Sequence, residues 1–214
     1  MLKKRIIFTL HYDKGFFNLS RNFRLQKIGD LNWLLKNYNF LKIAESIDEL
    51  IIIDVSRDNR EHDKFLENVS EITKNIFVPV CLGGGIRTLE YAKKLFESGA
   101  DKINLNTSLF HDPSLVDEIS KTYGAQAIIG HIDFRKKEND YYVYTNNGAK
   151  EFSKIDIAFM EKILELNGVG FRANLKGQKL NLQIGFSHDV DFDIPKEIKI
   201  TVEKQTIIKI NGVD

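Results

Sequence analysis

Through about residue 166, short apolar runs alternate with amphipathic stretches along the chain. The run 50–53 is apolar at every position, which predicts a strand buried on both faces, whereas the apolar positions of 65–76 have helical spacing. The expected strands are 6–10, 49–55, 77–82, 102–105 and 125–132. The expected helices are 28–38, 64–76, 89–98, 113–123 and 155–166. Apolar strands that alternate with helices are typical of a parallel sheet covered on both faces.

This alternation amounts to about five βα units, and the fold class is therefore α/β. An open doubly wound sheet and part of a (βα)8 barrel both satisfy the pattern. Residues 141–144 are expected to form a small hairpin with the segment before them, because Asn146-Asn147-Gly148 is a turn signal.

From Gly168 onward the helical period disappears, and apolar and polar residues alternate between turn residues. The expected strands here are 171–175, 179–186, 189–194, 198–202 and 206–210. This pattern predicts a small antiparallel β segment with one face in solvent. The change of texture divides the chain into two expected domains, 1–166 and 167–214, joined near Glu165.

Size and charge limit the classes of function. The chain has 214 residues, of which 43% are hydrophobic, so it can bury a core. Its 31 Lys and Arg residues nearly balance its 30 Asp and Glu residues, so a general attraction to nucleic acid is not indicated. The single cysteine, Cys81, excludes an internal disulfide. We expect a cytoplasmic protein without a membrane span and without a cofactor.

Three glycines, Gly83 to Gly85, follow an expected strand and precede an expected helix. Glycine lets the backbone approach a ligand closely, and a helix N-terminus offers free N–H groups to a phosphate. The sequence predicts an anion site here, although a tight turn alone would also account for the glycines. Asn106 and Thr107 follow the next strand and would either bind the same anion or cap the next helix.

Two aspartates, Asp54 and Asp133, each end an expected strand. In a parallel barrel the carboxyl ends of the strands form the active face, where a carboxylate serves as general acid or base. A structural pairing with Arg57 or Arg135 is the alternative. His131 shares a strand face with Asp133, but two such side chains do not make a metal site, and we expect no metal.

Several motifs occur in order along the chain: RII from Arg5, DELIIID ending at Asp54, VCLGGGIR from Val80, GADKINLNT from Gly99, then ID and YVYT around the predicted hairpin. Together they resemble the HisF family, the cyclase subunit of imidazole glycerol phosphate synthase, over about residues 4–166. The resemblance implies a (βα)8 barrel that takes ammonia from a glutamine amidotransferase subunit. It also implies a phosphorylated small-molecule substrate and two catalytic aspartates.

The resemblance assigns roles residue by residue. Asp133 matches the family's strand-five catalytic aspartate, whereas His11 stands where the family has its strand-one aspartate. The implied phosphate-binding residues are Gly84, Gly85, Asn106 and Thr107. The implied ammonia gate comprises Arg5, Glu49 and Lys102.

Two departures from the family pattern affect the expected function. Residues 16–27 resemble instead the HisF-like proteins of surface-polysaccharide amino-sugar pathways, the WbuZ type, which are thought to install an amidino or amino group. Motifs for strands six to eight are not found, so we expect a partial TIM-type barrel with one phosphate site and without cyclase activity.

The second segment resembles bacterial large-subunit ribosomal protein six over about 165–214, through GVGFRA from Gly168 and GFSH from Gly185. The resemblance implies rRNA binding. Arg172, Lys176 and Lys179 are the candidate contacts, and ordinary solvated charge is the alternative reading. The sequence thus leaves open an enzyme, an rRNA-binding fragment and a non-functional chimera.

Overall fold

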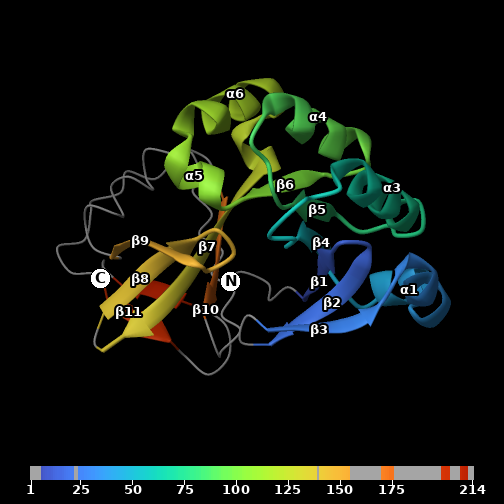
Figure 1. Ribbon diagram of the computed structural model, residues 1–214, viewed down its shortest axis with the longest axis horizontal. Helices are drawn as coiled ribbons and strands as arrows, with labels where there is room; N and C mark the ends of the chain where they lie inside the picture. Colours follow the sequence, from blue (N-terminus) through green and yellow to red (C-terminus); the bar gives the residue numbers. More distant parts are fainter. Residues whose placement is uncertain are drawn as a thin grey trace. The chain divides into compact units, whose positions relative to one another are not determined.

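The computed structural model describes residues 6–21, 24–138, 140–154, 170–175, 199–202 and 208–211 (Figure 1). The chain divides into two compact units, Met1–Leu105 and Asn106–Asp214. The expected helix over 155–166 and the expected domain boundary near Glu165 lie outside the described residues, so both stay predictions.

The first unit is a sheet with helices between its parallel strands. Its strands are β1 (Ile7–Asp13), β2 (Phe16–Arg21), β3 (Arg24–Gly29), β4 (Glu49–Asp54), β5 (Val80–Gly83) and β6 (Lys102–Leu105). Its helices are α1 (Leu31–Asn37), α2 (Phe40–Ala44), α3 (His62–Thr73) and α4 (Leu89–Glu97). Within this unit the strand order is β3-β2-β1-β4-β5-β6, and β1, β4, β5 and β6 are parallel. The α/β class and the parallel pairing are confirmed, and they are consistent with part of a TIM-type barrel.

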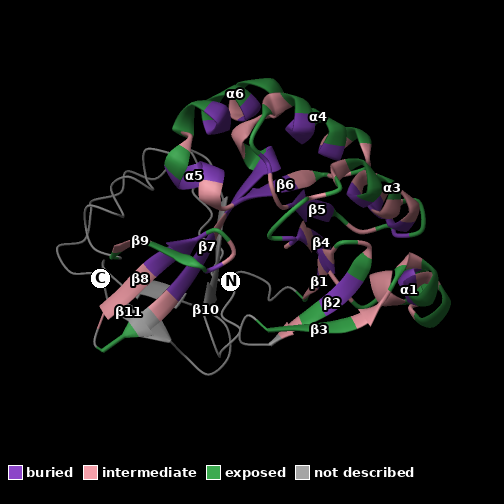
Figure 2. Cartoon of the chain, in the orientation of Figure 1, coloured by how far each residue is buried: buried purple, intermediate pink, exposed green. Residues whose placement is uncertain are grey.

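One face of this sheet forms the core of the unit. Leu10, Ile52 and Leu82 share that face and are completely buried, because successive side chains of a strand alternate between the two faces. Tyr12 extends the same row, and its ring lies 5.1 Å from that of Phe65 on α3. The buried strands and the buried side of α3 are visible in Figure 2.

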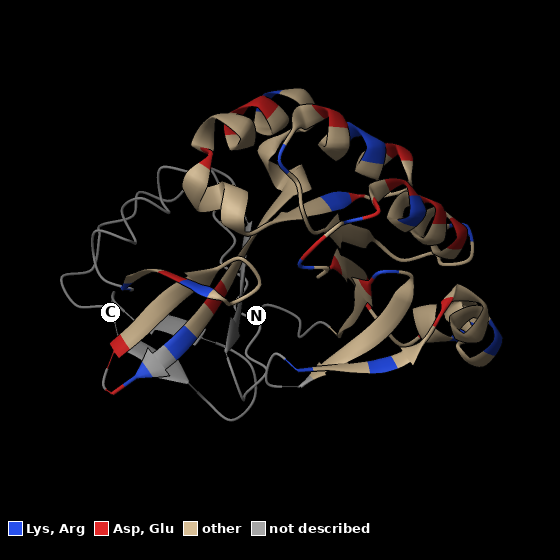
Figure 3. Ribbon diagram, viewed as in Figure 1, with Lys and Arg blue, Asp and Glu red and all other residues tan. Residues whose placement is uncertain are grey.

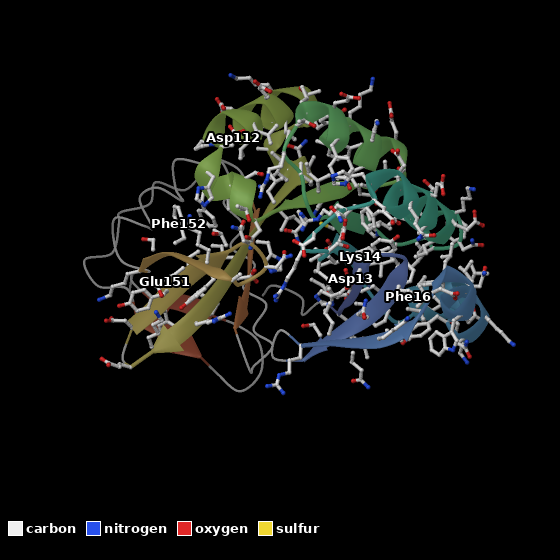
Figure 4. The ribbon with its side chains drawn as sticks, in the orientation of Figure 1. Asp13, Lys14, Phe16, Asp112, Glu151 and Phe152 are labelled. Carbon is white, nitrogen blue, oxygen red and sulfur yellow. The ribbon has the colours of Figure 1, made fainter. Side chains whose placement is uncertain are left out.

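The hairpin of β2 and β3 was not expected from the sequence. Asp13 pairs with Phe16, which leaves Lys14 and Gly15 as a two-residue loop, and both have positive φ (47° and 89°) as a type I′ turn requires (Figure 4). A Lys-Gly pair is a weaker turn signal than Asn-Gly. Strand β3 extends to Gly29, so α1 begins at Leu31 and not at residue 28, where the sequence predicted the helix to start.

The helices carry their charges on the side away from the sheet. Lys, Arg, Asp and Glu alternate along α3, α4 and the later helix α6 (Pro113–Tyr123) (Figure 3). Three of these pairs are spaced i, i+4, including Lys94 with Glu90 and Lys121 with Asp117. The helix starts are specified locally as well, since Thr88 caps α4 through the N–H of Tyr91.

The second unit begins with helices and continues as an antiparallel sheet. Its helices are α5 (Thr107–His111), α6 (Pro113–Tyr123) and the 3-10 turn η1 (Ala125–Ala127). Its first strands are β7 (Ile128–Lys137), β8 (Asp140–Thr145) and β9 (Lys150–Lys154). The expected hairpin of β7 and β8 is confirmed. The expected turn at 146–148 is occupied by three residues with positive φ, and it leads into β9, which was not expected.

The remaining strands differ in part from the expected antiparallel meander. Strand β10 (Gly170–Leu175) pairs in parallel with residues 129–134 of β7, so its expected antiparallel pairing is wrong. Alternation of apolar and polar residues indicates which face of a strand is exposed to solvent, but it does not fix the direction of the partner strand. Strands β11 (Lys199–Val202) and β12 (Ile208–Asn211) are antiparallel, as expected. The expected strands 179–186 and 189–194 lie outside the described residues.

Candidate functional site

In the second unit, β7 and α5 bring together a carboxylate, an imidazole and an amide. Asp133 lies on β7 and is 7% exposed. Its Oδ1 lies 3.2 Å from Nε2 of His131, two residues earlier on the same strand face. Its Oδ2 accepts a hydrogen bond from Nδ2 of Asn106 at 3.2 Å. The carboxylate is therefore held at both oxygens.

The amide of Asn106 is itself fixed from both ends. Its Nδ2 also donates to the carbonyl of His131 at 3.1 Å, and its Oδ1 accepts from the hydroxyl of Thr107. The Thr107 hydroxyl in turn accepts from the backbone N–H of Asn146, after β8. The predicted site residues Asn106, Thr107 and Asp133 thus form one network. The phosphate-binding role of the first two stays a prediction.

The alternative pairing of Asp133 with Arg135 is not what the structure shows. The Arg135 guanidinium donates to the carbonyl of Gly148 and lies over the ring of Tyr144, 4.3 Å from its centroid. The turn between β8 and β9 therefore binds the arginine. On the same unit, Phe152 of β9 packs its ring 5.1 Å from that of Phe110 on α5 (Figure 4).

In the first unit, Asp54 ends β4 in a more enclosed environment. It is 1% exposed, and its Oδ1 accepts from the N–H of Ser56 at 2.9 Å. Its Oδ2 lies 3.6 Å from Nε of Arg60, an ion-pair distance that is too long for a hydrogen bond. The sequence analysis offered a structural pairing with Arg57 as the alternative role of this aspartate. The structure instead brings Arg60, on the loop between β4 and α3, to Asp54.

The glycine run packs tightly against that same loop. Gly84 and Gly85 both have positive φ, 107° and 69°. A Cβ on Gly84 would lie 2.1 Å from the carbonyl oxygen of Asp54, and one on Gly85 would lie 2.7 Å from Cδ of Arg60. The loop therefore needs glycine for its own packing, whether or not it also binds an anion.

Two ionisable rings that the sequence did not single out lie beside this loop. His62, at the start of α3, and Tyr91, on α4, have ring centroids 4.0 Å apart. Burial lowers the pKa of His62 and raises the pKa of Tyr91. The charged stretch that precedes α3, SRDNREHD, is the signal that could have indicated this cluster, because it follows the carboxyl end of a strand.

The other predicted residues of the first unit share the opposite face of the sheet from Tyr12 and Asp54. Glu49 pairs with Ile7 and so lies on the face of His11, and Lys102 pairs with Cys81 on that same face. Glu49 is completely buried at the start of β4, and Lys102 starts β6. The third expected gate residue, Arg5, lies outside the described residues.

Of the candidate rRNA contacts, Arg172 alone lies within the described residues. Arg172 lies on β10 at the register position of His131, and Lys176 and Lys179 lie outside the described residues. Within the described ranges, His, Cys, Asp and Glu do not gather in groups of three that would hold a metal ion.

None of the helices in the described part of the chain has the length and hydrophobicity needed to span a bilayer.

Comparison with known proteins gives two family matches. The family described as Histidine biosynthesis protein matches residues 27–173. The family described as Ribosomal protein L6 matches residues 167–214. The two matches overlap at 167–173, where β10 begins.

Curated relatives agree with the first match. A protein of Parasynechococcus marenigrum, provisionally named imidazole glycerol phosphate synthase subunit hisF2, is 52% identical over 151 residues, which is 71% of this chain and 56% of the relative. The imidazole glycerol phosphate synthase subunit HisF of Pelodictyon phaeoclathratiforme is 31% identical over 94% of this chain and 79% of its own length. That of Exiguobacterium sp. is 34% identical over 78% of this chain and 64% of its own length.

The chain thus spans between about half and about four fifths of the length of these relatives. Its parallel βα architecture agrees with the family match over 27–173. The chain belongs to the histidine biosynthesis protein family.

Proposed function

We propose that this chain carries an ammonia-using, cyclase-type active site with Asp133 as its acid–base group. The absence of cyclase activity expected from the sequence stays a prediction, and the assay below decides between the two. The observation that carries the proposal is the Asp133 carboxylate, which within the described part of the chain has one oxygen hydrogen-bonded to Asn106 and the other facing the His131 imidazole. Such a carboxylate can exchange a proton with a ligand. The names of the relatives supply the reaction, synthesis of imidazole glycerol phosphate.

The substrate in this proposal is a phosphorylated small molecule. The Gly84–Gly85 loop is its first phosphate site, and the Arg60 side chain packed on Gly85 adds positive charge there. A nucleotide-linked amino sugar is the alternative substrate, because residues 16–27 resemble the WbuZ type. These residues form the hairpin of β2 and β3.

Ammonia would come from a glutamine amidotransferase subunit. Glu49 and Lys102 support this route because both stand at the amino ends of parallel strands and on one face of the sheet. Strand β5 lies between them, which separates their backbones by about 10 Å. Arg5 and His11 are the remaining proposed contributors, as gate residue and as strand-one acid–base group.

The direct test supplies ammonium salt and the histidine-pathway intermediate to the purified chain and measures imidazole glycerol phosphate by mass spectrometry. Asp133→Asn should lower turnover by about 100-fold or more, because the amide cannot take up a proton. The matched control is Asp117→Asn, whose carboxylate is 74% exposed on α6. Product at the wild-type rate from Asp133→Asn, or none from the wild type, would contradict the proposal.

A second candidate function, rRNA binding, is favoured only by the ribosomal-protein match over 167–214. Basic and acidic residues roughly balance in this segment, which argues against a strong phosphate-binding face. Co-sedimentation with large ribosomal subunits at low salt separates the two candidates. We expect no co-sedimentation, and binding that falls with Arg172→Ala would favour the ribosomal function instead.

A further inference from the structure

The imidazole beside Asp133 supports an inference that rests on the proposed function and extends it. We propose that His131 is a positioning residue that shares a proton with Asp133, so that β7 alone supplies a group able to act as both base and acid. His131 and Asp133 stand two residues apart on one strand face, with Nε2 and Oδ1 3.2 Å apart.

The geometry around the pair limits how the carboxylate can turn. Asn106 donates to Oδ2 of Asp133 and also to the backbone carbonyl of His131, so one amide holds both members of the pair. The side chains of His131 and Asp133 are 12% and 10% exposed. The pair is therefore largely shielded from bulk water, and a small part of each side chain stays accessible.

The proton balance of the pair is simple. In the tautomer whose Nε2 carries no hydrogen, Asp133 accepts one proton from the substrate on Oδ1. The new Oδ1–H then donates to Nε2, and the proton passes to the imidazole. The pair is then an imidazolium and a carboxylate. The reverse movement returns the same proton to a leaving oxygen or nitrogen of the substrate, so no other acid or base is consumed.

This arrangement would matter because the family resemblance assigns acid–base work to two aspartates, on two different strands. Here His11 replaces the one on strand one, whereas the aspartate on β7 has gained an imidazole neighbour. A proton-sharing pair within β7 would let one strand both take a proton from the substrate and return it.

The first experiment measures ammonia-dependent turnover from about pH 5 to about pH 9 for the wild type and for His131→Gln. Glutamine can present either an N–H donor or a carbonyl acceptor near the Nε2 position but cannot take up a proton, so a purely structural role would survive the change. We expect kcat to fall about 10- to 100-fold with KM nearly unchanged, and the pH profile to lose one limb. The matched control is His111→Gln on the exposed end of α5, for which rate and profile should stay as in the wild type.

A second measurement tests the contact between His131 and Asp133 in the absence of substrate. Nitrogen-15 spectra of the histidine rings are compared between the wild type and Asp133→Asn. The Nε2 signal of His131 should move when the carboxylate is replaced, whereas the signals of His111 should not.

The outcomes separate the inference from the function beneath it. Turnover by the wild type with an unchanged rate and pH profile in His131→Gln would overturn the proton-sharing pair and leave the proposed function intact. Absence of product from the wild type would contradict the proposed function. In that event, an Nε2 signal that is identical in Asp133→Asn overturns the pair as well, and a displaced one supports it.

Discussion

Asp54 ends the buried strand β4, whereas Asp133 lies within β7, which continues to Lys137 beyond the end expected from the sequence. Their surroundings differ as well. Asp54, in the first unit, is enclosed by the glycine loop and lies 3.6 Å from the permanent charge of Arg60. Asp133, in the second unit, contacts an imidazole and an amide, and part of its side chain is exposed. The two buried strand aspartates are therefore suited to two different purposes.

The difference lies in what the partners can do with a proton. A guanidinium is a permanent cation, so loss of the Asp54 charge would leave the partly buried Arg60 without its counter-ion. An imidazole can both donate and accept a proton, so its contact with Asp133 is compatible with proton exchange at the carboxylate. The first carboxylate is suited to hold a loop, and the second to take part in chemistry.

The largest expected effect tests how tightly the Asp54 region is enclosed. Gly84→Ala should destabilise the protein by about 3–5 kcal/mol, because the new Cβ meets a backbone oxygen and the residue has positive φ. Gly15→Ala is the control: its φ is also positive, but its nearest neighbour is the flexible end of Lys64, and we expect about 1–2 kcal/mol. Urea unfolding measures both, and equal losses would show that the glycine loop is not closely packed.

The next effect separates the two carboxylates directly. Asp54→Asn should cost about 2–4 kcal/mol of unfolding free energy, because it leaves the Arg60 charge without its partner in a largely buried site. Asp133→Asn should cost less than about 1 kcal/mol, since an amide can keep the hydrogen bond from Asn106. A larger loss for Asp133→Asn than for Asp54→Asn would reverse the comparison.

The smallest effect concerns the pH dependence of the Asp54 region. Because burial lowers the pKa of His62, the unfolded chain takes up a proton below about pH 6.5 that the folded chain resists. This contribution to stability is present above that pH and is lost as the pH falls. In His62→Gln the stability difference between about pH 7.5 and about pH 5.5 should shrink by less than about 1 kcal/mol. His111→Gln should leave this pH-dependent stability difference unchanged. If both variants give the same difference, burial of His62 is not the cause of the pH dependence.

Much of the fold could be predicted where one strong periodicity dominated. Strand β6 and helix α6 have the expected bounds, and for α6 the segment from Pro113 to Gly124 is a strong local signal. The hairpin of β2 and β3 was missed, since its exposed residues, such as Leu19 and Leu25, do not alternate cleanly with polar ones. The direction of β10 was wrong because a partner strand, and not its own pattern, sets that direction.

The candidate site, too, was predictable only in part. Asp133, Asn106 and Thr107 could be named from motifs and from their places after strands, but their joining into one network depends on how β7 and α5 approach each other. Arg60, His62 and Tyr91 had no motif to mark them. Their grouping depends on a loop that folds back over the glycine run.

The sequence by itself determined the α/β class, the family resemblances, the glycine loop and the strand end at Asp54, because these depend on spacing along the chain. Only the tertiary structure decided which aspartate contacts an arginine and which contacts an imidazole. The physical reason is that a carboxylate's role follows from the groups within a few ångströms of it, and those groups include backbone and side chains from other elements.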